Sequence, residues 1–557
     1  MKIYFIGYCL LACLLFTNFS TAQTVSDSTT PSQPRIVNIV NFIRLLEPRD
    51  SSITEDVLYE TVVKQVEILK QYHLKGTFLL QYDALMDSRY QNLLRNLPKD
   101  EFEIGAWWEI PQPLVEHAGL KWRGRYPWDW RANIGFSTGY SQDERIKLID
   151  TYMKDFKKIF GDYPKSVSSW FIDAFSLNYM YEKYHIVASG NCKDQYGTDG
   201  YTLWGGYWNQ AYYPSKLNAY MPAQNAAKQI PVPIFRMLGS DPVRQYDNGL
   251  GNERQGVITL EPVYAFGGGD SAWVHWFFQQ MINGEPLAFA YAQAGQENSF
   301  TWNAMQHGFE IQMPLIAQLR DEHKIAVETL GESGKWFKTH YTLTPPTAVT
   351  VTKDLDSSNK KTVWYDSRFY RMNFLWKDDG LRIRDIHLFN ENFPSVYETK
   401  PVTENECKFF TLPFVDGYIW SDSNAFAGLR FKAMIDGKEV LLRGKDVSVR
   451  KNATGDLEIV WQLQTVKGKF IIDCSERNFI VRLESTSSLN WYLDFSSAIN
   501  AQLPFTNIQS KNIACKFEGF DYNVAANEGT FVKLSNNTSF KIQPTNNTIV
   551  LRMDEGR

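Results

Sequence analysis

Between residues 35 and 330 the sequence alternates short apolar runs with amphipathic stretches of helical length, and this alternation limits the fold more than any other feature. The run RIVNIVNFI (35–43) predicts a buried strand, residues 52–73 predict a helix capped by Thr54, and KGTFLLQY (75–82) predicts the next strand. Strands that alternate with helices at this spacing predict a parallel sheet, and seven or eight such units close it into a barrel.

The same alternation continues along the segment. We expect an α/β fold of the (β/α)7-barrel type over residues 35–340. Further strands are expected at 102–109, 165–173, 185–192, 230–238, 256–263 and 285–293, and helices at 141–160, 176–184 and 303–330.

The composition changes after the last of these helices. Residues 341–362 are rich in Thr, Pro, Ser and Asp and are expected to form a connector. Beyond them, period-two alternation and turn signals such as DDG and IDGK predict an antiparallel β-sandwich domain over residues 363–557.

The N-terminus has an early lysine, an apolar run and small residues before Gln23, which together predict a secretory signal peptide over residues 1–22 and a linker over 23–34. We therefore expect the chain to be secreted or periplasmic. A lipid anchor on Cys13, which would place it on the outer surface, is the less favoured alternative. The cysteines at 192, 407, 474 and 515 have no CxxC spacing and are expected to be buried free thiols.

The composition excludes several classes of function. A formal net charge of −4 over 557 residues gives no reason to expect nucleic acid as a partner. No later segment reaches the roughly 20 apolar residues that span a bilayer. There is no GxSxG elbow, no P-loop and no HxxxH spacing, so we expect no cofactor and no histidine-based metal site, while an all-oxygen calcium site stays open.

Carboxylates dominate the polar residues that end the apolar runs. Glu109, Asp173, Glu261 and Glu297 each lie among aromatic or small residues, which favours a raised pKa and acid catalysis. The alternative for any one of them is a helix cap or a solvated loop residue. Other polar candidates for substrate binding near these run ends are Asn41, Arg44, Asn191, Asp194 and Gln296.

Aromatic residues make up 15% of the chain and gather in the same places. Beside Asn, Gln, Asp and Arg they form flat apolar platforms rimmed by hydrogen-bonding groups, which suit pyranose rings. Ordinary core packing is the alternative. Such stretches are AWWE, KWRGRYPWDWRANIGF, GYTLWGGYWNQAYYPSKLN and SAWVHWFF, and the residues assigned to sugar binding are Trp107, Trp108, Trp204, Trp208 and Trp302.

The segment 36–312 resembles the superfamily of polysaccharide deacetylases and family 57 and family 38 glycoside hydrolases, which share a seven-stranded (β/α) barrel. The resemblance is carried by KGTFLLQY, FEIGAWWE and PKSVSSWFIDAFSLNYMYEKYHIVASGN. The deacetylases need an Asp-Asp pair after the first strand and two histidines after the third, where this chain reads NFIRLLEP and AWWEIPQP. The resemblance therefore implies a metal-independent branch.

The leading hypothesis is a glycoside hydrolase that cleaves a poly- or oligosaccharide with two carboxylates. By its position on the fourth strand, Asp173 resembles the nucleophile of the family 57 enzymes. Glu261 is the preferred acid, with Glu297 and Glu109 in reserve. The alternatives are a non-catalytic glycan-binding protein and an unconventional carbohydrate deacetylase.

Overall fold

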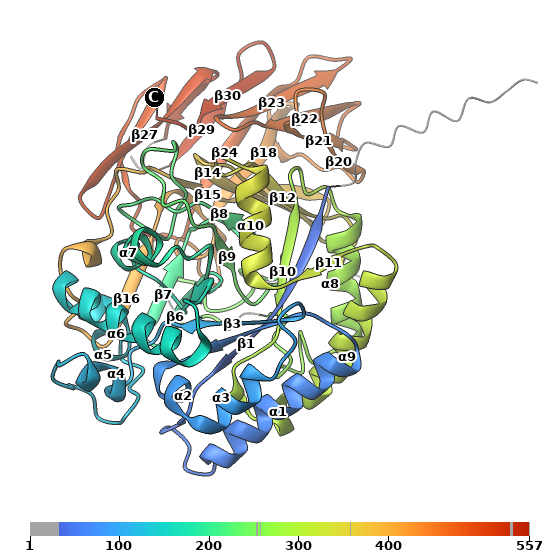
Figure 1. The fold of residues 1–557 in the computed structure, drawn as a ribbon. Coiled ribbons are helices and arrows are strands. Elements are labelled where there is room, and N and C mark those ends of the chain that lie inside the picture. The colour runs from blue at the N-terminus through green and yellow to red at the C-terminus, as the bar shows by residue number, and fades with distance from the viewer. Residues whose placement is uncertain (1–32, 252–253, 257, 357, 535–538, 556–557) are drawn as a thin grey trace, which may run out of the picture. The chain divides into compact units, whose positions relative to one another are not determined.

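The computed structural model of the protein describes residues 33–251, 254–256, 258–356, 358–534 and 539–555 (Figure 1). The expected signal peptide, Cys13 and all but the last two residues of the expected linker lie outside the described residues. Within the described part of the chain, no helix combines the length and the apolar character needed to cross a membrane.

The first half of the chain forms a nearly closed barrel of 8 strands, in the order β10-β1-β2-β3-β4-β5-β9-β8. Neighbours along this path are parallel, except that β8 pairs antiparallel with β9. An additional short strand, β11, pairs with β1. The strands are β1 (Arg35–Ile43), β2 (Gly76–Leu80), β3 (Phe102–Trp107), β4 (Ser166–Ser168), β5 (Ala188–Asn191), β8 (Ala211–Tyr212), β9 (Ile234–Arg236), β10 (Ala290–Ala294) and β11 (Ala326–Glu328).

Several of the helices around the barrel begin at side-chain caps that the sequence supplies. Thr54 caps α1 by accepting a hydrogen bond from the Val57 N–H, and Ser141 forms a capping box with Glu144 at the start of α6. The helices are α1 (Glu55–Gln71), α2 (Tyr82–Met86), α3 (Ser88–Arg95), α4 (Gln112–His117), α5 (Ala132–Gly135), α6 (Gln142–Phe160), α7 (Ala174–Tyr184), α8 (Ser271–Asn283), α9 (Trp302–Asp321) and α10 (Leu330–His340), with 3-10 turns η1 (Ser137–Gly139), η2 (Asn298–Phe300) and η3 (Val396–Glu398).

Two sequence expectations in the barrel are wrong. The helix expected over 303–330 ends at Asp321, because strand β11 and the cap of α10 follow it. The strand expected over 256–263 is a loop in its described residues, in which Thr259 makes only an isolated bridge to Ser240. Glu261 therefore lies on a loop and not at the end of a barrel strand.

The second half of the chain forms two antiparallel sheets packed as a sandwich. The DDG and IDGK signals form tight hairpins in which Asp378, Asp379, Asp436 and Gly437 have positive φ, as type I′ turns require. One sheet contains β12 (Thr347–Val351), β13 (Lys361–Asp366), β14 (Tyr370–Lys377), β15 (Gly380–Leu388), β17 (Leu412–Asp416), β18 (Gly428–Ile435), β19 (Lys438–Leu441), β24 (Asn490–Ser496), β28 (Thr530–Lys533) and β29 (Phe540–Gln543); the other contains β20 (Val447–Lys451), β21 (Leu457–Gln462), β22 (Gly468–Cys474), β23 (Asn478–Ser485), β25 (Phe505–Ile508), β26 (Asn512–Phe517), β27 (Phe520–Glu528) and β30 (Thr548–Arg552).

A small third sheet joins the two halves. Strands β6 (Gln195–Thr198) and β7 (Tyr201–Trp204) follow β5 of the barrel, whereas β16 (Cys407–Phe410) comes from the middle of the sandwich sequence. β16 pairs in parallel with β7. The barrel and the sandwich are therefore connected by backbone hydrogen bonds as well as by side-chain packing.

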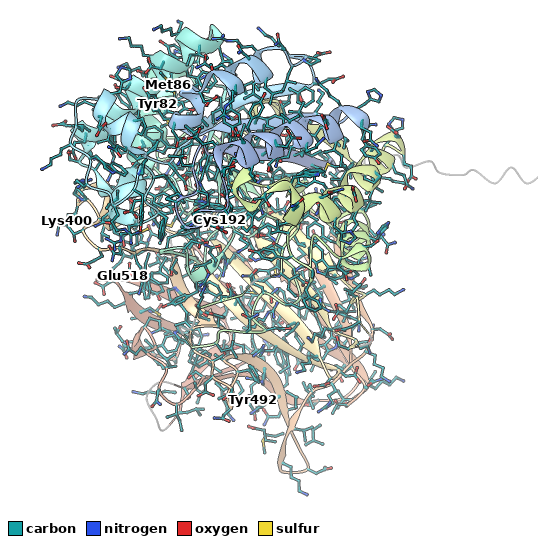
Figure 2. The ribbon with its side chains drawn as sticks, turned by 90° about the horizontal axis from the view of Figure 1, so that it is seen from below. Tyr82, Met86, Cys192, Lys400, Tyr492 and Glu518 are labelled. Carbon is teal, nitrogen blue, oxygen red and sulfur yellow. The ribbon has the colours of Figure 1, made fainter. Side chains whose placement is uncertain are left out.

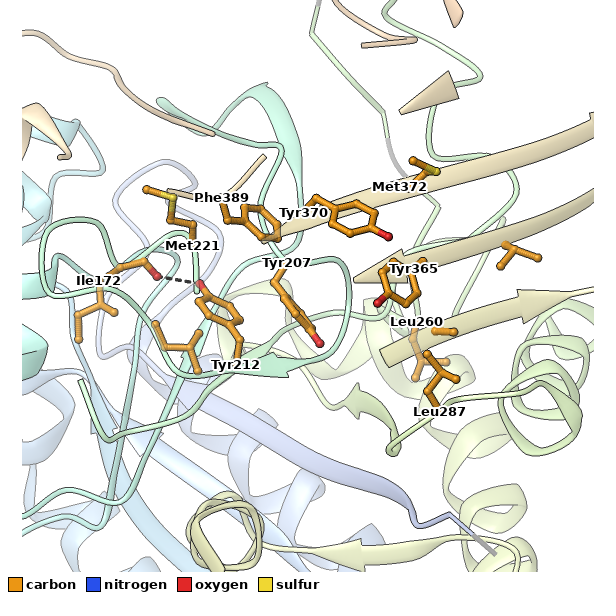
Figure 3. Packing of buried hydrophobic residues seen from close by; sticks show 14 of the residues in the cluster. Ile172, Tyr207, Tyr212, Met221, Leu260, Leu287, Tyr365, Tyr370, Met372 and Phe389 are labelled. Atoms are coloured by element: carbon orange, nitrogen blue, oxygen red, sulfur yellow. Dashed lines mark hydrogen bonds between the residues drawn. The ribbon is translucent and has the colours of Figure 1, made fainter. Parts of the chain in front are cut away.

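One apolar cluster runs through both halves (Figure 3). Tyr207, from a barrel loop, has its ring centroid 5.5 Å from that of Tyr212 and 6.5 Å from that of Phe389, which follows β15. Its hydroxyl donates to the Pro345 carbonyl at 2.7 Å. The cysteines at 192, 407, 474 and 515 are buried free thiols, as expected from the sequence.

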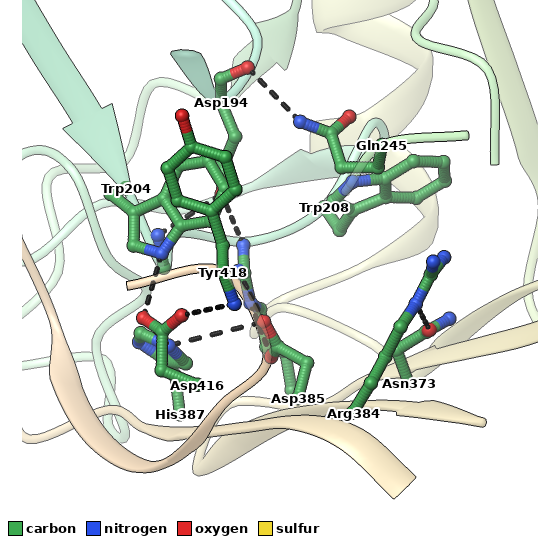
Figure 4. Close-up of polar contacts among 12 residues, drawn as sticks. Asp194, Trp204, Trp208, Gln245, Asn373, Arg384, Asp385, His387, Asp416 and Tyr418 are labelled. Carbon is green, nitrogen blue, oxygen red and sulfur yellow. Dashed lines mark hydrogen bonds and ion pairs between the residues drawn. The ribbon is translucent and has the colours of Figure 1, made fainter. Parts of the chain in front are cut away.

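A buried charged cluster, here called the Asp194 cluster, lies at the same junction (Figure 4). Asp194 accepts hydrogen bonds from Arg236 at 2.8 Å and from Arg371 of β14, and Arg371 also pairs with Asp385 of β15 at 2.8 Å. Tyr220 donates a further hydrogen bond to Asp194. These side chains tie the end of β5 to the first strands of the sandwich.

Candidate active site

A cleft with a volume of about 870 Å³ opens at the carboxyl ends of the barrel strands. This is the end of a parallel barrel at which reactive groups gather, because the loops that follow the strands converge there. The lining residues from these loops include Arg44 after β1, Glu109 after β3, Trp170 after β4, Lys193 after β5, Leu238 after β9 and Glu297 after β10.

The loop after β10 reaches the cleft because its backbone passes close to β1. Gly295 has φ 98°, and a Cβ at this position would lie 2.2 Å from the carbonyl oxygen of Val40. Only glycine fits this approach. The next residues, Gln296 and Glu297, are thereby directed toward the cleft wall.

One wall of the cleft carries what we call the Arg44 cluster: Arg44, Glu109 and Glu297. Arg44 Nε and Nη2 donate to the two carboxylate oxygens of Glu109 at 2.9 and 2.8 Å. Its Nη1 donates to Glu297 Oε2. The Nε2 of Gln81 adds a hydrogen bond to Glu109 at 3.0 Å. One guanidinium therefore serves two carboxyl groups.

The charge balance of this cluster affects the acidity of its members. Burial raises the pKa of Glu297 to about 7. The positive charge of Arg44 acts to lower this pKa, but the negative charge of Glu109 opposes that effect. Burial also raises the pKa of the neighbouring Asp83 to about 7. Burial acts to lower the pKa of Arg44, but the charges of Glu109 and Glu297 outweigh it, so that the net shift is upward.

Glu261 approaches the cleft from the loop before α8 and is oriented by two donors. Thr259 Oγ1 donates to its Oε2 at 2.7 Å, and Gln296 Nε2 donates to its Oε1 at 3.0 Å. The side-chain oxygen of Gln296 accepts from the backbone N–H of Glu297 at 2.8 Å. Gln296 thus links the two carboxyl residues. The charge of Glu261 raises the pKa of Tyr264.

Aromatic side chains form much of the remaining lining. The guanidinium of Arg44 lies 4.2 Å from the ring centroid of Trp128, and that of Arg49 lies 5.0 Å from the same ring and 5.7 Å from Trp130. Phe266 is 82% exposed at the rim. The aromatic lining residues are Trp128, Trp130, Phe136, Trp170, Tyr201, Tyr264, Phe266 and Phe300.

Four residues proposed from the sequence line this cleft: Arg44, Glu109, Glu261 and Glu297. Gln296 lies directly behind it as the link between Glu261 and Glu297. Asn41 lies one layer deeper, where its side-chain oxygen accepts from the Gln296 N–H at 3.2 Å. The structure therefore brings these residues, which are distant in sequence, together at one cleft.

The assignment of Asp173 as nucleophile does not agree with its position. Asp173 is fully buried, is not part of the cleft lining and caps α7 by accepting from the Ser176 N–H at 2.8 Å. Its two oxygens also accept from Arg145 at 2.9 Å and from Ser137 at 2.5 Å. A carboxylate engaged in this way is a structural group, so Asp173 takes the alternative role of helix cap.

The paired tryptophans after β3 are also not a sugar platform. Trp107 and Trp108 are 0% and 1% exposed. Trp107 stacks on Phe42 with a centroid distance of 3.9 Å, and Trp108 packs edge-on against Tyr152. Of this triplet only Glu109 lines the cleft.

Five further candidates lie away from the cleft lining. Trp204 donates from Nε1 to Asp416 at 2.8 Å, and Trp208 stacks on Trp364 at 4.2 Å, so both belong to the junction with the sandwich. The remaining three are Asp194, which is sealed in its cluster, Asn191, which accepts from the Ile172 N–H, and Trp302, which packs on Phe309.

Sequence reasoning missed several lining residues. Trp128 and Trp130 lie within the aromatic stretch KWRGRYPWDWRANIGF, where alternation with Arg and Asp was a usable signal. Lys193 was missed because its neighbour Asp194, which is sealed in its own cluster, was chosen in its place. Within the described residues, no group of three or more His, Cys, Asp or Glu side chains is placed to hold a metal ion.

The fold and the cleft define an α/β barrel with a carboxylate-containing site at the carboxyl ends of its strands, followed by a β-sandwich. A family model described as a domain of unknown function with a solved structure, DUF3863, matches residues 136–342, which is less than half of the chain. No curated protein matches.

Several solved structures are similar to the chain. A candidate glycoside hydrolase/deacetylase from Parabacteroides distasonis has a TM-score of 0.49 and 16% identity, and covers 66% of this chain and 88% of its own. A candidate polysaccharide deacetylase from Mycobacterium smegmatis has a TM-score of 0.34 and 11% identity, with 59% and 96% covered. The 4-alpha-glucanotransferase from Thermococcus litoralis has a TM-score of 0.27 and 10% identity, with 93% and 99% covered. None of these similarities assigns a reaction to this chain.

Proposed function

We propose that the cleft hydrolyses glycosidic bonds of a poly- or oligosaccharide, with Glu297 as the acid and Glu261 as the nucleophile or base. The observation that carries this proposal is the pair of carboxyl residues joined through Gln296 beside an aromatic-lined cleft. Glycosidases use two carboxyl groups whose environments give them different protonation states.

Glu297 suits the role of acid. A pKa of about 7, raised by burial, keeps a large fraction of this carboxyl group protonated near neutrality. Its proton would pass to the leaving glycosidic oxygen as the bond between that oxygen and the anomeric carbon breaks. Arg44 and Glu109 would hold the carboxyl group in position.

Glu261 suits the complementary role. Both of its oxygens accept hydrogen bonds, from Thr259 and from Gln296, which is the arrangement expected for a carboxylate. As a base it would take a proton from the attacking water, whose oxygen bonds to the anomeric carbon. As a nucleophile it would form that bond itself, and water would then release the sugar.

We also propose that the reaction needs no metal ion, because the positive charge between Glu109 and Glu297 is supplied by the guanidinium of Arg44. Prolonged treatment with EDTA should leave the rate unchanged. Loss of activity that one divalent ion restores would contradict this part of the proposal. Export of the chain, inferred from residues 1–22, stays a separate prediction.

The test is a panel of plant and host polysaccharides assayed for new reducing ends and, in parallel, for released acetate. On a substrate that is cleaved, Glu297→Gln and Glu261→Gln should each lower kcat by roughly 100- to 10,000-fold, because each removes a proton or a charge and keeps the shape. Glu310→Gln, on the exposed side of α9, is the matched control.

Two further measurements separate the roles. Glu297→Gln should retain activity on an aryl glycoside with an acidic leaving group, which needs no proton, and azide should restore turnover to Glu261→Ala if Glu261 is a nucleophile. Release of acetate without new reducing ends would favour a deacetylase. Binding of a polysaccharide without release of either product would favour a glycan-binding protein.

A further inference from the structure

Lys193 is a buried cation that lines the cleft and does not belong to the Arg44 cluster. It follows β5, is 5% exposed and lines the cavity. The preceding residue, Cys192, lies fully buried in the interior of the molecule (Figure 2). A lysine so deeply buried is usually paired with a carboxylate, since an isolated charge is costly to remove from water.

Lys193 has one partner among the described residues. Its Nζ donates to Gln195 Oε1 at 3.0 Å, and no described carboxylate lies within ion-pair distance of it. An ammonium group has three N–H donors. Two donors of a buried cation are therefore left for whatever enters the cleft.

The partner itself is held in place. The Nε2 of Gln195 donates to the Thr198 carbonyl at 3.4 Å, and its Oε1 is also within 3.6 Å of Cys192 Sγ. This fixes the side-chain oxygen that orients Lys193. The ammonium group is thus positioned by the fold before any ligand binds.

A second cation lies on the same wall. Arg254 is exposed at the cleft beside β6, since the next residue, Gln255, donates its N–H to the Tyr196 carbonyl at 3.0 Å. Asp199 and Glu261 also line the cleft, but among the described residues neither Lys193 nor Arg254 forms an ion pair with either of them. This wall differs from the Arg44 cluster, where carboxylates neutralise the guanidinium.

We propose that Lys193 forms a subsite for an anionic group of the saccharide, either the carboxylate of a uronic acid or a sulfate ester. This inference rests on the proposed saccharide substrate and specifies its class as an acidic polysaccharide. Such a group supplies the anion that the ammonium group lacks, and its oxygens accept hydrogen bonds from the two remaining N–H groups of Lys193. Arg254 adds positive charge at the entrance to the subsite.

The probes are matched monosaccharides, so that the unknown linkage does not matter. The methyl glycosides of glucuronic and galacturonic acid, those of glucose and galactose, and galactose 6-sulfate are titrated into the full chain by ligand-observed NMR at fixed ionic strength. We expect one of the anionic sugars to bind at least about tenfold more tightly than its neutral counterpart. The sulfate arm shows which anion is preferred.

Variants assign this preference to the residue. Lys193→Met and Lys193→Gln should bind acidic and neutral sugars equally, Lys193→Arg should keep most of the preference, and Lys154→Met, an exposed lysine of α6, should keep all of it. Circular dichroism and Tm confirm that each variant is folded. Equal binding of both classes by the wild type, no binding of either, or an unchanged preference in both neutral variants would overturn the inference.

The same titration in Glu261→Gln separates this inference from the proposed reaction. If the preference for anionic sugars persists while neither acidic nor neutral polysaccharides are cleaved by the wild type, the subsite stands and the hydrolase proposal fails. If polysaccharides are cleaved without any such preference, the hydrolase proposal stands and the subsite fails.

Discussion

Two clusters of arginine and carboxylate side chains in this molecule use the same residue types with opposite effects. In the Arg44 cluster one guanidinium faces two carboxylates, and the pKa of Glu297 rises to about 7. In the Asp194 cluster two guanidinium groups contact the carboxylate of Asp194, and one of them, Arg371, also pairs with Asp385. Burial acts to raise the pKa of Asp194, but Arg371 and Arg236 outweigh it and the net shift is downward.

The difference shows that the number of guanidinium groups in contact with a buried carboxylate decides what that carboxylate can do. A carboxylate that contacts two guanidinium groups stays ionised and is a structural group. Of two carboxylates that share one guanidinium group, one can hold a proton near neutral pH. The Arg44 cluster borders the cleft, whereas the Asp194 cluster is sealed between barrel and sandwich.

The largest effect should come from the sealed cluster. Asp194→Asn leaves Arg236 and Arg371 without their shared anion, so the free energy of unfolding should fall by about 3–5 kcal/mol, measured by urea denaturation. Asp521→Asn, an exposed carboxylate 3.7 Å from Lys516, is the control and should cost less than about 1 kcal/mol. A loss of similar size in both variants would contradict the structural role.

Glu109→Gln should change the pH dependence of activity. The negative charge of Glu109 helps to raise the pKa of Glu297, so that its removal should lower this pKa. An acid works only while protonated, and activity is therefore lost as pH rises through its pKa. The basic limb of the kcat profile, expected near pH 7, should move down by about one pH unit. An unmoved limb or an upward shift would show that Glu297 is not the acid.

A smaller effect is expected from the aromatic wall. Trp130 is partly exposed and lines the cleft, so Trp130→Ala should weaken saccharide binding by roughly 1–2 kcal/mol and leave Tm almost unchanged. Isothermal titration and thermal unfolding give the two values. Trp204→Ala, beside the Asp194 cluster, should instead lower Tm strongly. If both variants lose only stability, Trp130 is a packing residue.

The smallest effect concerns Asp83, which lies beside the Arg44 cluster. Burial raises its pKa to about 7, so between about pH 4 and 7 the folded state binds more protons than the unfolded state. The stability that Asp83 contributes is fully present below about pH 4 and is lost as the pH rises through about 7. Asp83→Asn should flatten the decline of stability between about pH 6 and 7 by about 1 kcal/mol. An unchanged slope would place the pKa of Asp83 lower.

Much of the barrel could be predicted from the sequence because its signals are local. The period of 3.6 residues, the cap at Thr54 and the apolar run of β1 each act over a few positions. The DDG hairpin was predictable for the same reason. The point at which helix α9 ends was not predictable, because the residues after Asp321 are apolar enough for either helix or strand. Pairing with β1 selects the strand.

The candidate site was only partly predictable. Residues that follow a strand could be named, and Arg44, Glu109, Glu261 and Glu297 were found in this way. The direction in which each side chain points could not be predicted, since a shift of one position along an extended segment turns the side chain to the other side. Asp194 and Lys193 illustrate this, as do Trp108 and Glu109. Asp173 was misassigned because its contact with Arg145 joins two elements that are distant in sequence, and local patterns do not predict such a contact even though the helix over 141–160 was expected.

The pairing of β16 with β7 has a consequence for how the molecule is made. β7 contributes Tyr201 to the cleft wall, but its partner strand is encoded only after the barrel and the first strands of the sandwich. Contacts between such distant segments form late, because the entropy cost of closing a long loop comes before the contacts can stabilise the fold. During synthesis the barrel helices can therefore form first, whereas the cleft becomes complete only after Phe410 has left the ribosome.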